Sequence, residues 1–348
     1  MFERLIGNAF IKSALRRLIE GGRVPNSMLF TGIDGIGKKQ FAIELARAFV
    51  CKEPNGVEPC EMCSACKRAG VFNVPKPDDR DAYKRVVISE HLDIGMVMPF
   101  GRNILVDAIR HLEAEANFRP FEGRARLFIV DNADRMNDAA ANALLKTLEE
   151  PAPSTHIVLI TSRPDALLPT IMSRCQQLRF SPASEHDIEH YLTEHKGYHQ
   201  HDARLAAKFA LGSIGRAVGL DLNDIKTRRE RMFEVLENAV FRGDLAAQLK
   251  VSEAIADGKE KDSFEMSLDL LQALINDVWN ISVGGDATRL KNPDLEDRLA
   301  LIAGGSDRSQ LAAWNSEIEN LRGSLDVNIN RRIATDALFT TMTAGNTV

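Results

Sequence analysis

The chain has 348 residues, more than one ordinary hydrophobic core needs, so two or three domains are expected. Apolar residues make up 44% of it and charged residues 27%, which is typical of soluble globular proteins. The net charge of −5 excludes a protein that is basic over its whole surface and binds nucleic acid that way. No apolar run approaches about 18 residues and no signal-peptide pattern opens the sequence, so we expect a cytoplasmic protein without a membrane span.

The N-terminal part predicts a strand, a phosphate-binding loop and a helix, in that order. Ser27–Phe30 is a short apolar run that suits a buried parallel strand, and apolar residues recur at helical spacing after Lys38. Between them, Gly32, Gly37 and Lys38 satisfy the pattern G-x-x-x-x-G-K. Gly35 belongs to the same loop. The backbone N–H groups of such a loop point at an anion from a helix N-terminus, which predicts a site for nucleotide phosphates.

Two residues depart from the pattern of an active ATPase. Lys39 stands where P-loop ATPases carry a serine or threonine that ligates Mg²⁺, and a lysine would repel the cation. The apolar run 125–130 predicts a strand ending at Asp131, which matches the acidic residue that holds Mg²⁺. The next residue is Asn132, where such ATPases place a glutamate that activates water. Nucleotide binding stays open, because Lys38 can contact phosphate without the hydroxyl.

Four of the five cysteines form the pattern C-x8-C-x2-C-x2-C. Four thiolates at this spacing suit a structural zinc ion, since every ligand is a protein atom and none is left for water. Disulfides are an alternative that a cytosolic compartment disfavours, and an iron–sulfur cluster is another that lacks visible redox partners. The expected ligands are Cys51, Cys60, Cys63 and Cys66, whereas Cys175 is expected to be a small buried residue.

Strands and helices alternate further along the chain. Asp138–Glu150 predicts a helix that ends at a proline, with Leu144, Leu145 and Leu148 facing a core. His156–Ile160 predicts another buried strand, which ends at Thr161–Ser162. This alternation predicts a doubly wound α/β domain with ligands at the carboxyl ends of its strands.

These segments resemble the bacterial DNA polymerase III clamp loader, a branch of the AAA+ family. The resemblance spans residues 1 to about 180 and is carried by the segments Gly32–Lys38, the four cysteines, Asn142–Pro151 and Ser173–Cys175. The departures at Lys39 and Asn132 are similar to those of delta prime subunits, which are generally not ATPases. The alternative is an active gamma/tau-type motor, which would need a hydroxyl at position 39 and a glutamate at 132.

The resemblance implies roles for further residues. Arg174 would be an arginine finger that completes the ATP site of a neighbouring subunit; the alternative is an ordinary surface ion pair. Thr161 or Ser162 would match the sensor 1 position. Arg216, in Gly212–Ala217, would match sensor 2 on a helical lid. Implied partners are gamma/tau and delta subunits in a hetero-oligomeric ring, and through them the sliding clamp and primed DNA.

The implied organisation has three parts. An AAA+ α/β domain would cover 1–181 with the zinc module at 51–66, followed by a helical lid at 182–225 and a helical collar at 226–348. The polar stretch 67–86 is expected to be a mobile inserted loop. Helical spacing in the collar is shown by Met266, Leu270, Leu271, Leu274, Val278, Trp279, Trp314, Ile318, Leu321, Ile329, Ile333, Leu338 and Met342.

Two interpretations involving DNA are open but weaker. Lys226, Arg228 and Arg229 form a basic patch that is explained equally well by a helix face with its charges in solvent. The cysteine module could itself contact DNA, which a basic and aromatic surround would favour. Its neighbours include Glu58 and Glu61, which do not.

Overall fold

The computed structural model describes residues 5–256, 261–325 and 330–344. Contacts divide the chain into two units, Met1–Gly219 and Leu220–Val348. The segment expected to form a lid therefore lies largely with the sheet in the first unit, and the division into three parts stays a prediction. Among the described residues, no helix is long and apolar enough to cross a membrane.

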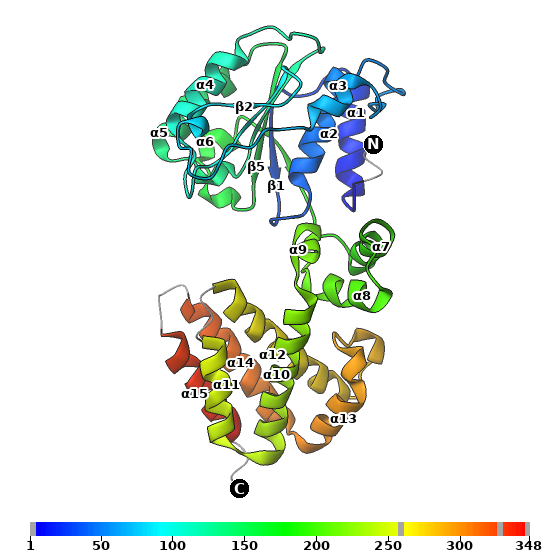
Figure 1. Ribbon diagram of the computed structural model, residues 1–348, viewed down its shortest axis with the longest axis vertical. Helices are drawn as coiled ribbons and strands as arrows, with labels where there is room; N and C mark the ends of the chain where they lie inside the picture. The colour runs from blue at the N-terminus through cyan, green and yellow to red at the C-terminus, as the bar shows by residue number, and fades with distance from the viewer. Residues whose placement is uncertain (1–4, 257–260, 326–329, 345–348) are drawn as a thin grey trace. The chain divides into compact units, whose positions relative to one another are not determined.

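A six-stranded sheet forms the centre of the first unit (Figure 1). Every neighbouring pair is parallel except β2 and β3. The strands predicted at 27–30, 125–130 and 156–160 are confirmed to within one residue at each end. In spatial order the strands are β2 (Val87–Ile88), β3 (Ile94–Val97), β4 (Arg126–Val130), β5 (Thr155–Thr161), β1 (Ser27–Thr31) and β6 (Gln176–Arg179).

Helices cover both faces of this sheet, as the doubly wound prediction requires (Figure 1). Successive strand residues point to opposite faces, so Phe30 enters the core of one face and Leu29 the core of the other. Leu144 and Leu148 are buried as predicted, and Leu145 packs at the edge of the same core. One face carries α1 (Ala9–Glu20), α2 (Lys38–Val50) and α3 (Ser64–Ala69); the other carries α4 (Val106–Ala116), α5 (Asp138–Glu149) and α6 (Pro169–Met172).

The stretch predicted as an inserted loop, 67–86, is partly regular. Its first residues belong to α3, which begins after Cys63 because the sulfur of that residue accepts the N–H of Cys66. Its end forms the 3₁₀ turn Ala82–Lys84. Tyr83 is buried there and donates its hydroxyl to the carbonyl of Pro75 at 3.2 Å. The middle of the stretch thus folds back on itself. After β6 the first unit ends with α7 (Glu185–Lys196), α8 (Gln200–Phe209) and α9 (Ile214–Gly219).

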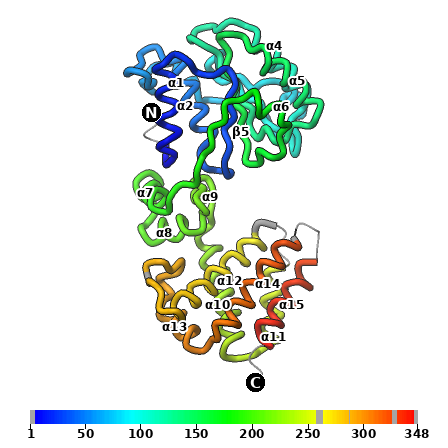
Figure 2. The backbone as a smooth tube through the Cα atoms, turned by 180° about the vertical axis from the view of Figure 1, so that it is seen from behind, coloured from blue at the N-terminus to red at the C-terminus, as the bar shows by residue number. Residues whose placement is uncertain are grey.

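The described part of the second unit is helical, and Figure 2 shows α12 running alongside α10 and α14. Most residues predicted from helical spacing are buried in it. Trp279 and Ile333 are instead 37% and 66% exposed, because each lies in the terminal turn of its helix, where neighbouring helices no longer cover it. Ile329 lies outside the described residues. The helices are α10 (Leu222–Glu237), α11 (Leu245–Ala256), α12 (Lys261–Ser282), α13 (Glu296–Gly305), α14 (Arg308–Leu325) and α15 (Arg331–Ala344), with a π-helical turn at Asn238–Arg242.

Candidate functional site

The phosphate-binding loop lies between β1 and α2, at the carboxyl edge of the sheet. At two positions of this loop, a residue larger than glycine is disfavoured both by a positive φ angle and by the contacts that its Cβ would make. A Cβ on Gly32 (φ 145°) would lie 2.8 Å from the carbonyl oxygen of Phe180. A Cβ on Gly35 (φ 72°) would lie 2.4 Å from Oγ of Ser213. The loop therefore depends on backbone packing that no larger residue permits.

A cavity of about 530 Å³ opens beside this loop, within the first unit. Of the predicted cofactor residues, Gly32 and Arg216 are not among those that line it. Residues that no motif indicated also line it, among them Leu5, Tyr191 and Lys196. The predicted residues that do line the cavity are Gly35, Gly37, Lys38, Lys39, Asp131, Thr161 and Ser162.

Lys38, the lysine of the motif, is turned toward its own loop. Its Nζ donates hydrogen bonds to the carbonyl oxygens of Gly32 and Ile33, the second at 2.8 Å. Burial lowers the pKa of Lys38, although the carboxylates of Asp34, Asp131 and Asp134 act in the opposite direction. Among the described residues, the direct partners of this ammonium are carbonyl oxygens of its own loop, which a phosphate could replace.

Lys39 pairs with the strand-end acid. Its Nζ lies 2.5 Å from Oδ2 of Asp131, whose side chain is only 12% exposed. Asn132 follows in the left-handed region (φ 52°, ψ 54°), which asparagine tolerates better than most residues, and it also lines the cavity. Both departures from the ATPase pattern therefore lie at the site itself.

A second acid, Asp134, binds residues of the segment predicted to be sensor 1. Thr161 Oγ1 donates to its Oδ1 at 2.7 Å, and Arg163 contacts its Oδ2 at 2.6 and 3.0 Å. The hydroxyl of Thr161 is therefore hydrogen-bonded to an acid of the protein itself. Both Thr161 and Ser162 line the cavity. The acidic residue three positions after Asp131 was the sequence signal that could have indicated this contact.

The predicted sensor 2 segment touches the loop through its backbone. Gly215 N–H donates to the carbonyl of Gly35 at 2.8 Å, and Ser213 Oγ donates to the carbonyl of Asp34 at 2.7 Å. The N–H of Arg216 donates to Ser213 Oγ at 3.2 Å. The structure thus brings this segment to the loop through Ser213 and Gly215.

Arg174 follows α6 and is not among the residues that line the cavity. Its Nη2 lies 2.6 Å from Oε1 of Glu149, the last residue of α5, and its Nη1 donates to the carbonyl of Thr170 at 2.9 Å. The Arg174 side chain is 35% exposed. In this chain it therefore forms an ion pair at the surface. The next residue, Cys175, is buried as predicted, and burial raises the pKa of its thiol to about 12.

The four predicted metal ligands come together. Their sulfur atoms all lie within 4.8 Å of one another, and none of them forms a disulfide. Tetrahedral ligation at about 2.3 Å per sulfur requires sulfurs about 3.8 Å apart, so this set can hold a metal ion. Cys51 is at the end of α2, Cys63 and Cys66 are at the start of α3, and Cys60 lies on the loop between these helices.

The environment of the cysteine set lowers the pKa of one thiol and raises the pKa of two others. Burial opposes ionisation of Cys63, yet N–H groups including those of Lys52 and Cys66 lower its pKa to about 6. Burial raises the pKa of Cys66 and of Cys51. A bound cation would have to displace the protons of the latter two, so metal binding at this site should release protons.

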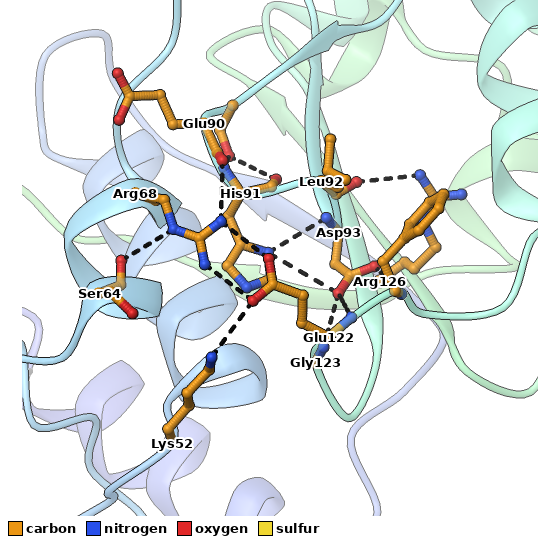
Figure 3. Close-up of polar contacts among 12 residues, drawn as sticks. Lys52, Ser64, Arg68, Glu90, His91, Leu92, Asp93, Glu122, Gly123 and Arg126 are labelled. Carbon is orange, nitrogen blue, oxygen red and sulfur yellow. Dashed lines mark hydrogen bonds and ion pairs between the residues drawn. The ribbon is translucent and has the colours of Figure 1, made fainter.

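A polar network, which sequence reasoning missed, joins the metal module to the loop before β4 (Figure 3). Glu122 accepts two hydrogen bonds from Arg68 at 2.9 Å and lies 3.5 Å from Nζ of Lys52. Arg68 follows Cys66 closely and Lys52 follows Cys51, so Glu122 touches both flanks of the cysteine set. Behind it, the buried carboxylate of Asp93 accepts the backbone N–H groups of Phe121, Glu122 and Gly123 at 2.7–2.9 Å.

The basic patch predicted on α10 does not present a row of unpaired arginines. Arg228 pairs with Asp224 at 2.5 Å, and the largely buried Arg229 pairs with Asp294 at 2.6 Å. The two arginines thus serve the second unit's own structure, which argues against a nucleic-acid contact at this helix.

Comparison with known proteins places these features in a family. A family model described as "DNA polymerase III, delta subunit" matches residues 7–184. DNA polymerase III subunit delta prime of Bacillus subtilis is 35% identical over 277 residues, which cover 79% of this chain and 78% of that protein. Its counterpart in Escherichia coli is 31% identical over 331 residues, 92% of this chain and 90% of that protein.

The same comparison finds a tau subunit that matches over a shorter stretch of the chain. Subunit tau of Escherichia coli DNA polymerase III is 29% identical over 224 residues, which cover 63% of this chain but only 32% of tau. The delta prime relatives thus match a larger share of both chains. The phosphate-binding loop, the cysteine set and the length of the match agree, and the chain belongs to the DNA polymerase III delta prime family.

Proposed function

We propose that this chain is a clamp-loader subunit that does not hydrolyse ATP but completes the ATP site of a neighbour. It would work with gamma/tau and delta subunits to place the sliding clamp on primed DNA. Its first unit would serve as an AAA+ module, its described C-terminal helices as a collar, and its cysteine set as a structural zinc site.

The observation that carries this proposal is the position of Arg174. Its guanidinium lies at the surface and not in the chain's own cavity, and it is held by an exposed partner, Glu149. An arginine in that position can reach the nucleotide of another subunit, and its planar fork suits phosphate oxygens. The chain's own site carries Lys39 and Asn132 where hydrolysis needs a hydroxyl and a carboxylate, which argues against the gamma/tau-type motor.

The test is ATP turnover by the complex reconstituted from this chain, gamma/tau and delta, with clamp and primed DNA. An arginine finger supplied in trans is worth about 10³–10⁵ in rate, so Arg174→Ala should sharply lower the part of turnover that depends on this interface. Arg174→Lys should rescue little, because lysine lacks the fork. The matched control is Arg110→Ala, which removes an arginine that is 67% exposed on α4.

Assembly must be measured beside turnover. We expect every variant to enter the complex, as judged by size-exclusion chromatography with light scattering. Wild-type turnover by a complex that contains Arg174→Ala would refute the finger role. Failure of the wild-type chain to join gamma/tau and delta would refute the clamp-loader assignment.

A further inference from the structure

Lys39 lies where the divalent cation of a P-loop ATPase would have to bind. In those enzymes Mg²⁺ is held between the hydroxyl after the loop lysine, the strand-end acid and the phosphate oxygens. Here the hydroxyl is absent, and Nζ of Lys39 lies 2.5 Å from Oδ2 of Asp131. Asp131 therefore already has a positive partner. The residues present do not fit Mg²⁺.

We propose that Lys39 acts as a built-in counter-ion in place of Mg²⁺, so that this site prefers a nucleoside triphosphate without its metal. The inference rests on the nucleotide-binding capacity of the proposed AAA+ module. An ammonium has three N–H donors, and Asp131 uses one, which leaves two for phosphate oxygens. Lys38 and the backbone N–H groups of the loop supply the remaining contacts.

The cavity has the size and lining for the rest of such a ligand. Its volume is about 530 Å³, within the range of small-molecule sites. Apolar and aromatic residues also line the cavity, among them Ile6, Tyr191 and Val218, together with Lys196. They offer a surface for a base, while the loop offers N–H groups and two lysines for phosphates. A lining that combines cationic, polar and apolar groups favours a nucleotide over a simple anion.

A metal on the same phosphates would be unfavourable. It would bring a second cation beside the ammonium of Lys39, in a site where the facing carboxylate is largely buried. The Lys39 side chain is 43% exposed, so the alternative is that it swings out and leaves Asp131 to the metal. These two arrangements predict opposite effects of Mg²⁺ on affinity.

The experiment measures the affinity of the full chain for a non-hydrolysable ATP analogue by calorimetry, in excess Mg²⁺ and in EDTA. We expect the wild type to bind about tenfold more tightly in EDTA, a size of coupling common between two ligands. Lys39→Thr supplies the missing hydroxyl and frees Asp131, so it should bind more tightly in Mg²⁺. Lys39→Arg keeps the charge and should keep the wild-type preference.

Two controls separate this role from general effects. Lys146→Thr removes a lysine that is 78% exposed on α5 and lies outside the cavity lining, so it should behave as the wild type. Asp131→Asn in the Lys39→Thr background should abolish the Mg²⁺ preference that Lys39→Thr creates. Thermal unfolding of each variant confirms that it is folded.

Several results would overturn the inference. They are a wild type that binds equally or more tightly in Mg²⁺, a Lys39→Thr variant that keeps the wild-type preference, and absence of analogue binding in both buffers. The last result would leave the clamp-loader assignment standing if the chain still assembled and supported clamp loading. Conversely, the chain could bind the analogue more tightly in EDTA, as expected, and yet fail to assemble with gamma/tau and delta. That result would refute the clamp-loader assignment and leave this inference standing.

Discussion

Replacing Cys63 with serine should release the metal from the cysteine set and disturb only its surroundings. A serine hydroxyl keeps its proton at neutral pH, so the ion loses one of four ligands. Structural zinc contributes about 10–16 kcal/mol in isolated finger peptides, where it is the main source of folding. Here the module is attached to a folded unit, so the loss should be limited to the contacts that the module itself makes.

The structure allows that loss to be estimated. Ala65 and Ala69 of α3 are fully buried against the sheet core, and each methyl group contributes about 0.8 kcal/mol. Nε of Arg47 donates to the carbonyl of Cys66 at 3.2 Å, a hydrogen bond worth about 1 kcal/mol. The first unit should therefore lose about 3 kcal/mol. For a unit of this size that corresponds to a melting temperature lower by roughly 6–12 °C.

The assay is elemental analysis of the purified chain together with calorimetric unfolding. The wild type should carry one zinc per chain, and Cys63→Ser should carry almost none. Cys175→Ser is the matched control, because it removes a buried cysteine outside the set and should keep the metal. Iron or no metal in the wild type would refute the zinc assignment. A fully unfolded Cys63→Ser chain would refute the estimate of a local effect.

Three further predictions concern catalysis and the network of Figure 3. The isolated chain should not turn over ATP, since the carboxylate missing at Asn132 is worth about 10²–10⁴ in rate as a general base and the hydroxyl missing at Lys39 deprives Mg²⁺ of a ligand; turnover near 1 s⁻¹ that Lys38→Ala abolishes would contradict this. Asp93→Ala should lower the free energy of unfolding by about 3–5 kcal/mol in urea titrations, because three backbone N–H groups lose a buried, charged acceptor, whereas Asp107→Ala at an exposed site should cost little. The hydrogen bonds from Arg68 lower the pKa of Glu122 from 4.5 to about 2. The stabilising contribution of Glu122 is therefore complete above about pH 4.5 and is lost as the pH falls toward 2. Across this range, the free energy of unfolding should fall less for Glu122→Gln than for the wild type.

The features predicted best from the sequence are those that local spacing determines. The P-loop and the cysteine set are short patterns, and the structure gathers their residues as the spacing indicates. The helix α5 was predicted to its last turn because Pro151 ends it. The positions of β1, β4 and β5 followed from apolar runs that parallel sheets require on both faces, whereas β2, β3 and β6 were not predicted.

The features that spacing could not predict are contacts between distant segments. Lys39 was expected to repel a cation, and the structure adds that it pairs with Asp131 across the sheet edge. Tyr191 and Lys196 reach the cavity from a helix that carries no motif. Arg174 had two predicted roles, and its contact with Glu149 depends on where α5 ends relative to α6. Such pairings are set by tertiary packing, on which a single sequence carries no direct information.

The contact between Gly35 and Gly215 restricts which sequences can form this site. A Cβ on Gly215 would lie 3.0 Å from Cα of Gly35 and a Cβ on Gly35 would lie 3.2 Å from Cα of Gly215, so either side chain would push apart two backbones that a hydrogen bond joins. Enlarging either residue would separate α9 from the loop, and a change at one could not be compensated by shrinking the other. The two positions should therefore favour glycine together, although they lie far apart along the chain, and a saturation library at both sites should be enriched in the parental pair.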